Sequence, residues 1–500
     1  MKGSPLNRNL LPIFLIPCGL ALAVWTGLLI GEGQWGKIYV PALAIIGTTA
    51  ILLLGSRYWL LIPFSLCFTA PVIPLGGRAV ELPELVTVVC LALFLIRRAF
   101  KMQKIQLLRP AHYPFLLYTA WAALIYFRNP VGFALFGASS GGARFYFAIF
   151  LALAAFLIIA NQQITNRDCK WILIGVVVGT FLDFIKILLY YYIFAGSAAF
   201  VDPLESYNWQ QELAIVPLAL VLILFSRYSI AEIFNLSKLW RLLVLLLCIP
   251  IILVSGKRTA VISLILYPLI AAASRKEFRY FFAWTACAGI LAAVLIMGQG
   301  RVFHLPLNAQ RAVSWLPGRW DPELQYMEGG KDVFRDRLRT LAKEKIQRNP
   351  WIGTGYRVQL QENQALTSTM ESKFDAIVLQ MALGSSWHNQ WLGYAADFGV
   401  PASILLAVIY ISVLSLSWRT YWRLPRGSLL QTMVMYVLIR TVVDIVFSNV
   451  GGHSANDAAS RWWTYGVVIA IAASLVKSRS PAAPIVQRAG LEAEPVRLPS

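Results

Sequence analysis

Long apolar stretches separated by short polar segments run along most of the chain. A helix that crosses a bilayer core of about 30 Å needs roughly 17–25 apolar residues, and by that criterion the sequence predicts about fourteen (12–14) transmembrane helices. The pattern therefore predicts an all-α polytopic membrane protein. The predicted spans are 10–30, 38–54, 58–75, 82–96, 113–127, 144–160, 171–194, 210–226, 240–254, 259–273, 279–298, 390–414, 428–449 and 462–476. The first span follows Lys2 and Arg8 and is longer than the apolar core of a signal peptide, so we expect it to be retained.

One long polar segment interrupts the series of spans. Within it, Phe334, Leu338, Leu341 and Ile346 recur at helical spacing among charged residues. This predicts an amphipathic helix that lies on the membrane surface or caps the bundle. The expected divisions are transmembrane helices at 1–298, a large extracytoplasmic loop at 299–389, further transmembrane helices at 390–476 and a disordered cytoplasmic tail at 477–500.

Composition supports a membrane protein and excludes soluble classes. Of the 500 residues, 58% are hydrophobic and 14% are charged, whereas a soluble domain has about 45–50% apolar and about 25% charged residues. The net charge of +20 would suggest a nucleic-acid partner in a soluble protein. In a polytopic membrane protein, the distribution of these basic residues among the loops indicates how the helices are oriented in the membrane. We therefore expect no nucleic acid partner. Lys and Arg of the short connecting segments fall mostly on the cytoplasmic side if both termini are cytoplasmic, which places the long loop outside.

Two pairs of opposite charges lie inside predicted spans. Asp183 and Lys186 are spaced i, i+3, and Arg440 and Asp444 are spaced i, i+4. Charges in a bilayer are costly and mark function by default, but these spacings also suit neutral ion pairs on one helix face. Both interpretations stay open.

The turn SGKRTA at 255–260 joins two predicted spans and carries Lys257 and Arg258. It directly precedes a helix whose free N–H groups and dipole favour an anion. A phosphate or diphosphate is the natural ligand, because a guanidinium matches its oxygens. The alternative is that the two cations only contact lipid headgroups.

Four histidines are present, and two of them, His388 and His453, fall at predicted outer membrane boundaries. Histidine can take a proton from an attacking hydroxyl, which glycosyl transfer to a sugar requires. The alternative for each is a helix cap, although Asp457 could orient His453. The histidines lack a carboxylate cluster, so we expect no metal site and no cofactor.

Three segments together resemble the O-antigen ligase and O-antigen polymerase superfamily, membrane enzymes that move glycans from a polyprenyl-diphosphate carrier. They are SGKRTA at 255–260, RNPWIGTGY at 348–356 and HNQWLGYAADFGVPASILL at 388–406. The similarity covers roughly residues 200–415, and its combined spacing is more specific than any one motif.

The resemblance implies roles for individual residues. Arg258 matches the arginine implied to hold the carrier diphosphate, with Lys257 as a helper. His388 matches the histidine implied to activate the acceptor hydroxyl, and Asn389 completes the His-Asn pair. A second family arginine has no counterpart at 202–214. The second contact to the diphosphate could instead come from Arg144, Arg311, Arg319 or Arg357. Further candidates for the site are Arg440, Asp444 and His453.

The function we expect is a glycosyltransferase of the bacterial inner membrane. It would transfer a glycan on the outer face from the polyprenyl-diphosphate-linked donor to a glycan or lipid-core acceptor, without a metal and with inversion. Polymerase and ligase share this chemistry, and the departure at 202–214 slightly favours polymerase or exopolysaccharide assembly. The alternative is a transporter or flippase of lipid-linked sugars, but such folds have internal repeats and short loops. A transferase of monophosphate-linked sugars would need paired carboxylates in the first outer loop, where only Glu32 occurs.

Overall fold

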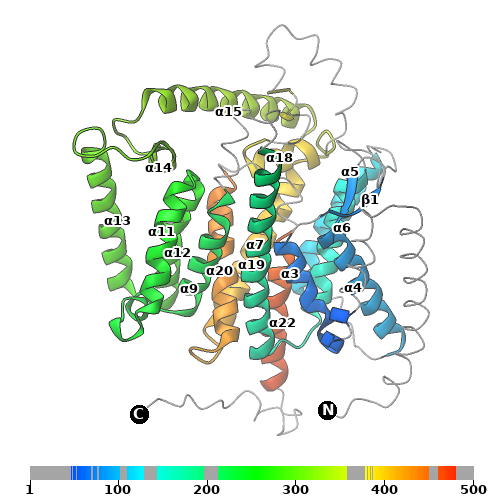
Figure 1. Ribbon diagram of the computed structural model, residues 1–500. Helices are drawn as coiled ribbons and strands as arrows, with labels where there is room; N and C mark the ends of the chain where they lie inside the picture. The colour runs from blue at the N-terminus through cyan, green and yellow to red at the C-terminus, as the bar shows by residue number, and fades with distance from the viewer. Residues whose placement is uncertain are drawn as a thin grey trace, which may run out of the picture.

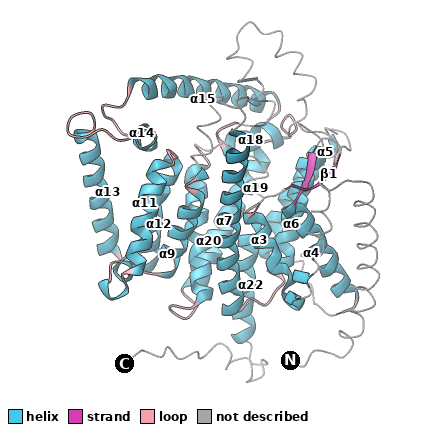
Figure 2. Ribbon diagram, viewed as in Figure 1, coloured by secondary structure: helices cyan, strands magenta, loops and turns pink. Residues whose placement is uncertain are grey.

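The protein is described from a computed structural model (Figure 1). The described residues are 47, 49–51, 53–68, 71–75, 78–101, 110–128, 143–195, 212–356, 378, 379, 381, 382, 385, 387–449 and 460–479. Within them the regular structure is helical apart from one two-stranded hairpin (Figure 2).

Most of the helices coincide with predicted spans. They are α4 (Leu82–Ala99), α5 (Tyr113–Arg128), α6 (Ala143–Ala160), α7 (Asn166–Ala195), α9 (Ile215–Arg227), α11 (Trp240–Val254), α12 (Arg258–Arg275), α13 (Phe278–Gly298), α19 (Val400–Tyr421), α20 (Leu429–Phe447) and α22 (Trp462–Arg479). The other elements are η2 (Gly55–Leu60), α3 (Leu61–Cys67), β1 (Pro71–Leu75), β2 (Arg78–Glu81), η3 (Pro110–His112), α10 (Ile230–Ile233), η4 (Leu236–Lys238), α14 (Leu307–Val313), α15 (Pro322–Arg348) and α18 (Gln390–Phe398).

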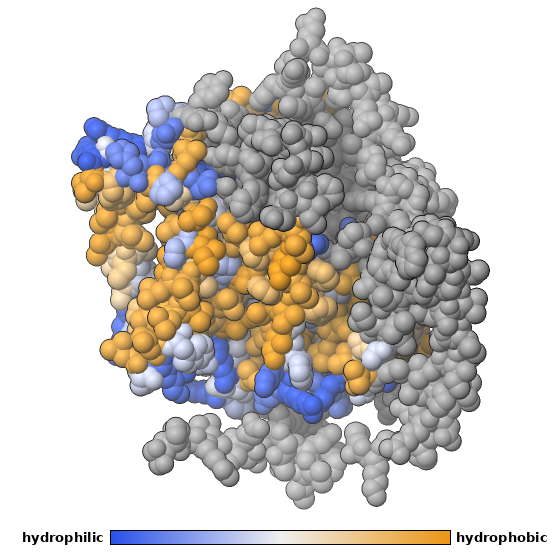
Figure 3. Space-filling view, in the orientation of Figure 1, coloured by the Kyte–Doolittle hydropathy of each residue, from blue (hydrophilic) through white to orange (hydrophobic). Residues whose placement is uncertain are grey.

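The long apolar helices define an all-α membrane protein. Within the described part of the chain, α7, α12, α13, α19 and α20 are long and apolar enough to cross a bilayer, and α6, α9, α11 and α22 contain shorter apolar helices. On the face drawn in Figure 3, the coloured part of the molecule is apolar in its middle, with hydrophilic side chains above and below. The spans predicted at 10–30 and 38–54 lie wholly or mostly outside the described residues, so the number fourteen stays a prediction.

Two predicted spans are interrupted. The segment predicted as one span at 58–75 forms η2, then α3, then strand β1, which pairs antiparallel with β2. Pro71 and Pro74 explain the change, because proline lacks an N–H group and disfavours helix in the residue before it. The segment predicted as one span at 390–414 forms two helices, α18 and α19, which are separated by Gly399 with φ of +84°.

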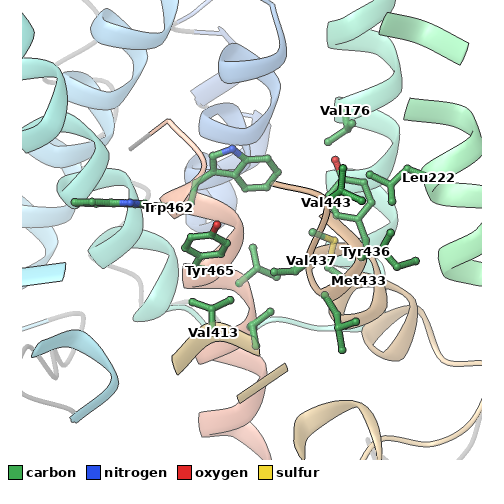
Figure 4. Close-up of a cluster of buried hydrophobic side chains, with 14 of the residues drawn as sticks. Val176, Leu222, Val413, Met433, Tyr436, Val437, Val443, Trp462 and Tyr465 are labelled. Carbon is green, nitrogen blue, oxygen red and sulfur yellow. The ribbon is translucent and has the colours of Figure 1, made fainter. Parts of the chain in front are cut away.

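Helix α20 lies at the centre of the bundle. It packs against α7, α9, α12, α19 and α22, and a cluster of buried side chains fills the space between these helices (Figure 4). Met433 and Val437 on α20 are fully buried, and so is Trp462 at the start of α22. This core fixes the helices whose ends carry the candidate site.

The predicted amphipathic helix lies within α15, which runs across one end of the bundle (Figure 1). Its Leu338 and Ala342 are buried and pack with Trp387 and with Ala396 of α18. Phe334, at the same helical spacing, packs at the edge of this cluster. The contact with α18 means that α15 caps the bundle.

Candidate active site at the capped end of the bundle

The turn before α12 places two cations at a helix N-terminus. Gly256 has φ of +67°, which a glycine adopts without steric cost. The Ser255 hydroxyl accepts the Lys257 backbone N–H at 3.2 Å, and α12 begins at Arg258. The side chain of the N-cap residue Lys257 makes no hydrogen bond to the first turn of α12.

Helix α14 packs against this turn and adds a third cation. The Arg258 side chain donates from Nε to the Arg311 carbonyl at 3.3 Å and from Nη2 to the Ser314 hydroxyl at 2.8 Å. A Cβ atom on Gly256 would lie 3.7 Å from Cδ of Arg311, so the Arg311 side chain runs beside the turn. Lys257, Arg258 and Arg311 therefore gather at the N-terminus of α12, where the helix dipole also favours an anion.

His388 lies at the entry to α18 in an unusual backbone conformation. Its φ is +50°, in the left-handed region that non-glycine residues rarely adopt. The next residue, Asn389, is the N-cap of α18, because its Oδ1 accepts the Leu392 N–H at 3.0 Å. The Asn389 amide also donates to the Asn449 carbonyl at 3.4 Å. The capping role that was the alternative for His388 therefore belongs to Asn389.

Helix α15 forms the other side of the His388 environment. The Phe334 ring meets the imidazole edge to face, with ring centroids 6.1 Å apart. Burial lowers the pKa of His388, and the neighbouring Arg335 cation lowers that pKa further. Both effects disfavour the imidazolium ion. The side chain is therefore neutral near pH 7 and able to accept a proton.

The segment RNPWIGTGY docks on the C-terminal end of α18. The Thr354 N–H donates to the Ala396 carbonyl and the Gly355 N–H to the Asp397 carbonyl, both at 2.9 Å. These bonds satisfy carbonyl groups that a helix end leaves unpaired. The backbones of this segment and of α18 approach so closely that a Cβ on Gly353 would lie 2.5 Å from the Asp397 carbonyl oxygen. Two of the three motif segments thus form one structural unit.

The intramembrane charges are arranged differently from one another. Lys186 donates to Asp183 at 2.6 Å, so this pair is neutralised on one helix face as one interpretation predicted. Arg440 instead donates to the Tyr436 hydroxyl at 3.2 Å. Asp444 pairs with Arg461 at 2.6 Å. For Arg440 and Asp444, where a pair on one helix face was one of two open interpretations, Asp444 is instead in an ion pair between α20 and the residue preceding α22.

The structure does not show the remaining predicted site residues at the turn that carries Lys257 and Arg258. Arg319 is exposed and its side chain lies against Gly300. Arg144 lies in the first turn of α6, and its side chain is outside the description. Arg357 and His453 fall outside the described residues.

Several neighbours of the site were not predicted. Arg335, beside His388, belongs to the charged face of α15 and has no local signal for this role. Trp387 is buried, and its indole N–H donates to Asp397 at 3.0 Å. The sequence did contain one signal for Asp397, which is an acidic residue within an apolar run.

The fold and the site define a helical membrane protein that carries a cationic turn and a loop histidine at one end of its bundle. Residues 242–407, about a third of the chain, match the family model Wzy_C, described as O-Antigen ligase. These residues are therefore similar to the O-antigen ligase family, and the predicted resemblance to that superfamily is confirmed. The matched segment extends from α11 into α19 and includes Arg258, Arg311 and His388. Comparison with curated proteins finds no significant match.

Proposed function

We propose that the chain transfers an oligo- or polysaccharide from a polyprenyl-diphosphate carrier to a sugar hydroxyl on the outer face of the bacterial inner membrane. The O-antigen ligase domain supports glycan transfer in general. The observation that carries the finer proposal is the cation cluster of Lys257, Arg258 and Arg311 at the N-terminus of α12. His388 lies at the same capped end of the bundle, at the start of α18 (Figure 1).

The cation cluster suits the leaving diphosphate. When the anomeric carbon departs from its carrier, negative charge builds on the bridging phosphate oxygen. Fixed cations and helix N–H groups stabilise that charge without reorganisation. The two hydrogen bonds that hold Arg258 against α14 supply such fixed placement. We therefore propose that Arg258 binds the diphosphate, with Lys257 and Arg311 beside it, and that no metal is required.

His388 suits the acceptor. Its lowered pKa keeps the imidazole neutral, as a general base must be. In the proposed step the acceptor hydroxyl loses its proton to His388, its oxygen bonds to the anomeric carbon, and the carbon–diphosphate bond breaks. Attack opposite the leaving group inverts the anomeric configuration. A product with retained configuration would overturn this part of the proposal.

The test uses full-length protein in lipid nanodiscs with a polyprenyl-diphosphate oligosaccharide and either a second lipid-linked glycan or a lipid core as acceptor. Release of polyprenyl diphosphate and the size of the glycan product are measured together. Wild type should release carrier diphosphate only with a suitable acceptor. The acceptor that is consumed distinguishes polymerase from ligase.

Three variants assign the roles. Arg258→Ala should lower kcat/KM by about 10²- to 10³-fold, as loss of a transition-state donor does. His388→Asn should lower it by about 10²- to 10⁴-fold while keeping a residue that tolerates positive φ. Ser314→Ala is the matched control, because it removes a contact of the guanidinium but keeps the cation, and it should lose less than Arg258→Ala. If wild type releases no diphosphate, or if all variants match it, the proposal fails. Flipping of lipid-linked sugars in liposomes would then be the function to test.

A further inference from the structure

Trp387 precedes α18, and its indole ring lies back along that helix. The ring contacts Asp397 and Gly393 of α18 and Lys345 of α15. The indole N–H donates to Oδ2 of Asp397 at 3.0 Å, and both side chains are buried. A Cβ on Gly393 would lie 2.8 Å from Cδ1 of Trp387, so the indole passes directly over this glycine. Lys345 of α15 places its Nζ 4.7 Å from the centre of the indole.

The spacing on α18 explains why the indole fits there. Gly393 and Asp397 are four residues apart, so they lie on the same helix face one turn apart. The glycine leaves room for the ring, and the aspartate accepts the N–H group at the far end of it. The Asp397 carbonyl is itself held by Gly355, which ties this end of α18 to the docked loop.

His388 is the residue between this anchor and the helix cap. On one side, the Trp387 side chain is held over α18. On the other side, Asn389 caps α18, and the Gln390 N–H donates to the Ser448 carbonyl at 2.7 Å. A strained backbone conformation such as the φ of +50° at His388 persists only when its surroundings determine it. The two anchors supply that constraint.

We infer that Trp387 and Asp397 are positioning residues, whose hydrogen bond holds His388 in the left-handed conformation that aims its imidazole at the acceptor. This inference rests on the proposed function of His388 as the base. Neither residue needs to touch the substrate. Their effect should therefore fall on the rate of the bound complex more than on donor binding, because small misplacement of a catalytic group costs rate.

The experiment compares variants of the full-length protein in the same transfer assay. Trp387→Phe removes the N–H group but keeps the ring over Gly393, and Asp397→Leu removes the acceptor. Each should lower kcat by up to about 100-fold while the donor KM stays within about twofold. Asp397→Asn keeps an acceptor oxygen and should restore most of the lost rate. The double variant Trp387→Phe/Asp397→Leu should be no slower than the slower single variant, because both break the same bond.

Trp391→Phe is the matched control. Trp391 lies on the same helix, and its ring packs edge to face on Tyr410, with centroids 5.9 Å apart. It should keep the wild-type kcat. Wild-type kcat in both single variants, additive losses in the double variant, or equal changes in KM and kcat would overturn the inference.

A second measurement does not depend on catalysis. The rate at which diethyl pyrocarbonate modifies His388 is followed by mass spectrometry in the folded protein. This rate should change in Trp387→Phe and Asp397→Leu and stay at the wild-type value in Trp391→Phe and Asp397→Asn. If wild type is inactive as a transferase but these rates change as expected, the positioning of His388 stands and the proposed function fails. Unchanged rates in Trp387→Phe and Asp397→Leu would refute the positioning itself.

Discussion

The carboxylate of Asp444 on α20 lies 2.6 Å from the guanidinium of Arg461, which directly precedes α22. Both side chains are largely buried, with 11% and 13% of their surfaces exposed. Such a pair compensates the desolvation of both charges only while both partners are present. The ion pair therefore holds the start of α22 against the central helix of the bundle.

Removal of one partner should destabilise the protein strongly. Asp444→Ala leaves the Arg461 charge buried, and the expected loss is about 3–5 kcal/mol of unfolding free energy. The double variant Asp444→Leu/Arg461→Met removes both charges and should recover much of that loss. Thermal unfolding in detergent, followed by size-exclusion chromatography, measures the order of the variants. A double variant less stable than Asp444→Ala would contradict this account.

Alanine at Gly353 of the docked loop, or at Gly399 directly after α18, should disrupt the contact between them. A Cβ on Gly399 would lie 2.1 Å from the Trp351 oxygen, and both Gly353 and Gly399 have positive φ. Because the clash is with backbone, we expect Gly353→Ala and Gly399→Ala each to cost more than about 4 kcal/mol. Gly427→Ala is the control, since Gly427 has φ of +72° but nothing within 4 Å of its Cβ position. It should cost only about 1 kcal/mol, from the left-handed conformation alone. Equal losses in all three variants would show that backbone conformation, not close approach, determines the effect.

Local periodicity explains what could be predicted of the fold. Helix α15 follows from apolar residues at helical spacing, and Leu338 is indeed buried in its contact with α18. The break at Gly399 was missed, although Pro401 in the first turn of α19 is a sequence signal for the start of a new helix. The break depends on the close approach of Trp351, which is distant in the sequence.

Contacts between distant residues explain what was missed in the site. The spacing of Arg440 and Asp444 allowed a pair on one helix, but Arg461 is the partner of Asp444 in three dimensions. The Trp387 bond to Asp397 likewise depends on the ring lying back along α18. Local spacing reveals which residues share a helix face, whereas it does not reveal which side chains from other elements meet them.

The pH dependence of transfer should report the cation beside His388. Arg335 lowers the pKa of His388, because a positive charge nearby disfavours the imidazolium ion. Arg335→Gln removes that effect, so the pKa should rise and a larger fraction of His388 should be protonated at a given pH. The acidic limb of the kcat/KM profile should therefore move to higher pH. Arg339→Gln, on the same helix but in an ion pair with Asp336 at 3.0 Å, is the control. An acidic limb that moves equally in both variants, or in neither, would contradict the assignment.

The second contact to the diphosphate should be Arg311. Its side chain runs beside Gly256 in the turn that carries Arg258, whereas the Arg319 side chain lies against Gly300. Loss of a charge-assisted hydrogen bond costs about 1.5–3 kcal/mol, so Arg311→Ala should raise the donor KM by about tenfold or more. As ionic strength rises, this defect should shrink less than a purely long-range effect would, because a direct contact is screened less by salt. Arg319→Ala is the matched control and should leave the donor KM within about twofold of wild type. Initial rates over a range of donor concentrations measure both constants, and a larger KM defect in Arg319→Ala than in Arg311→Ala would reverse the assignment.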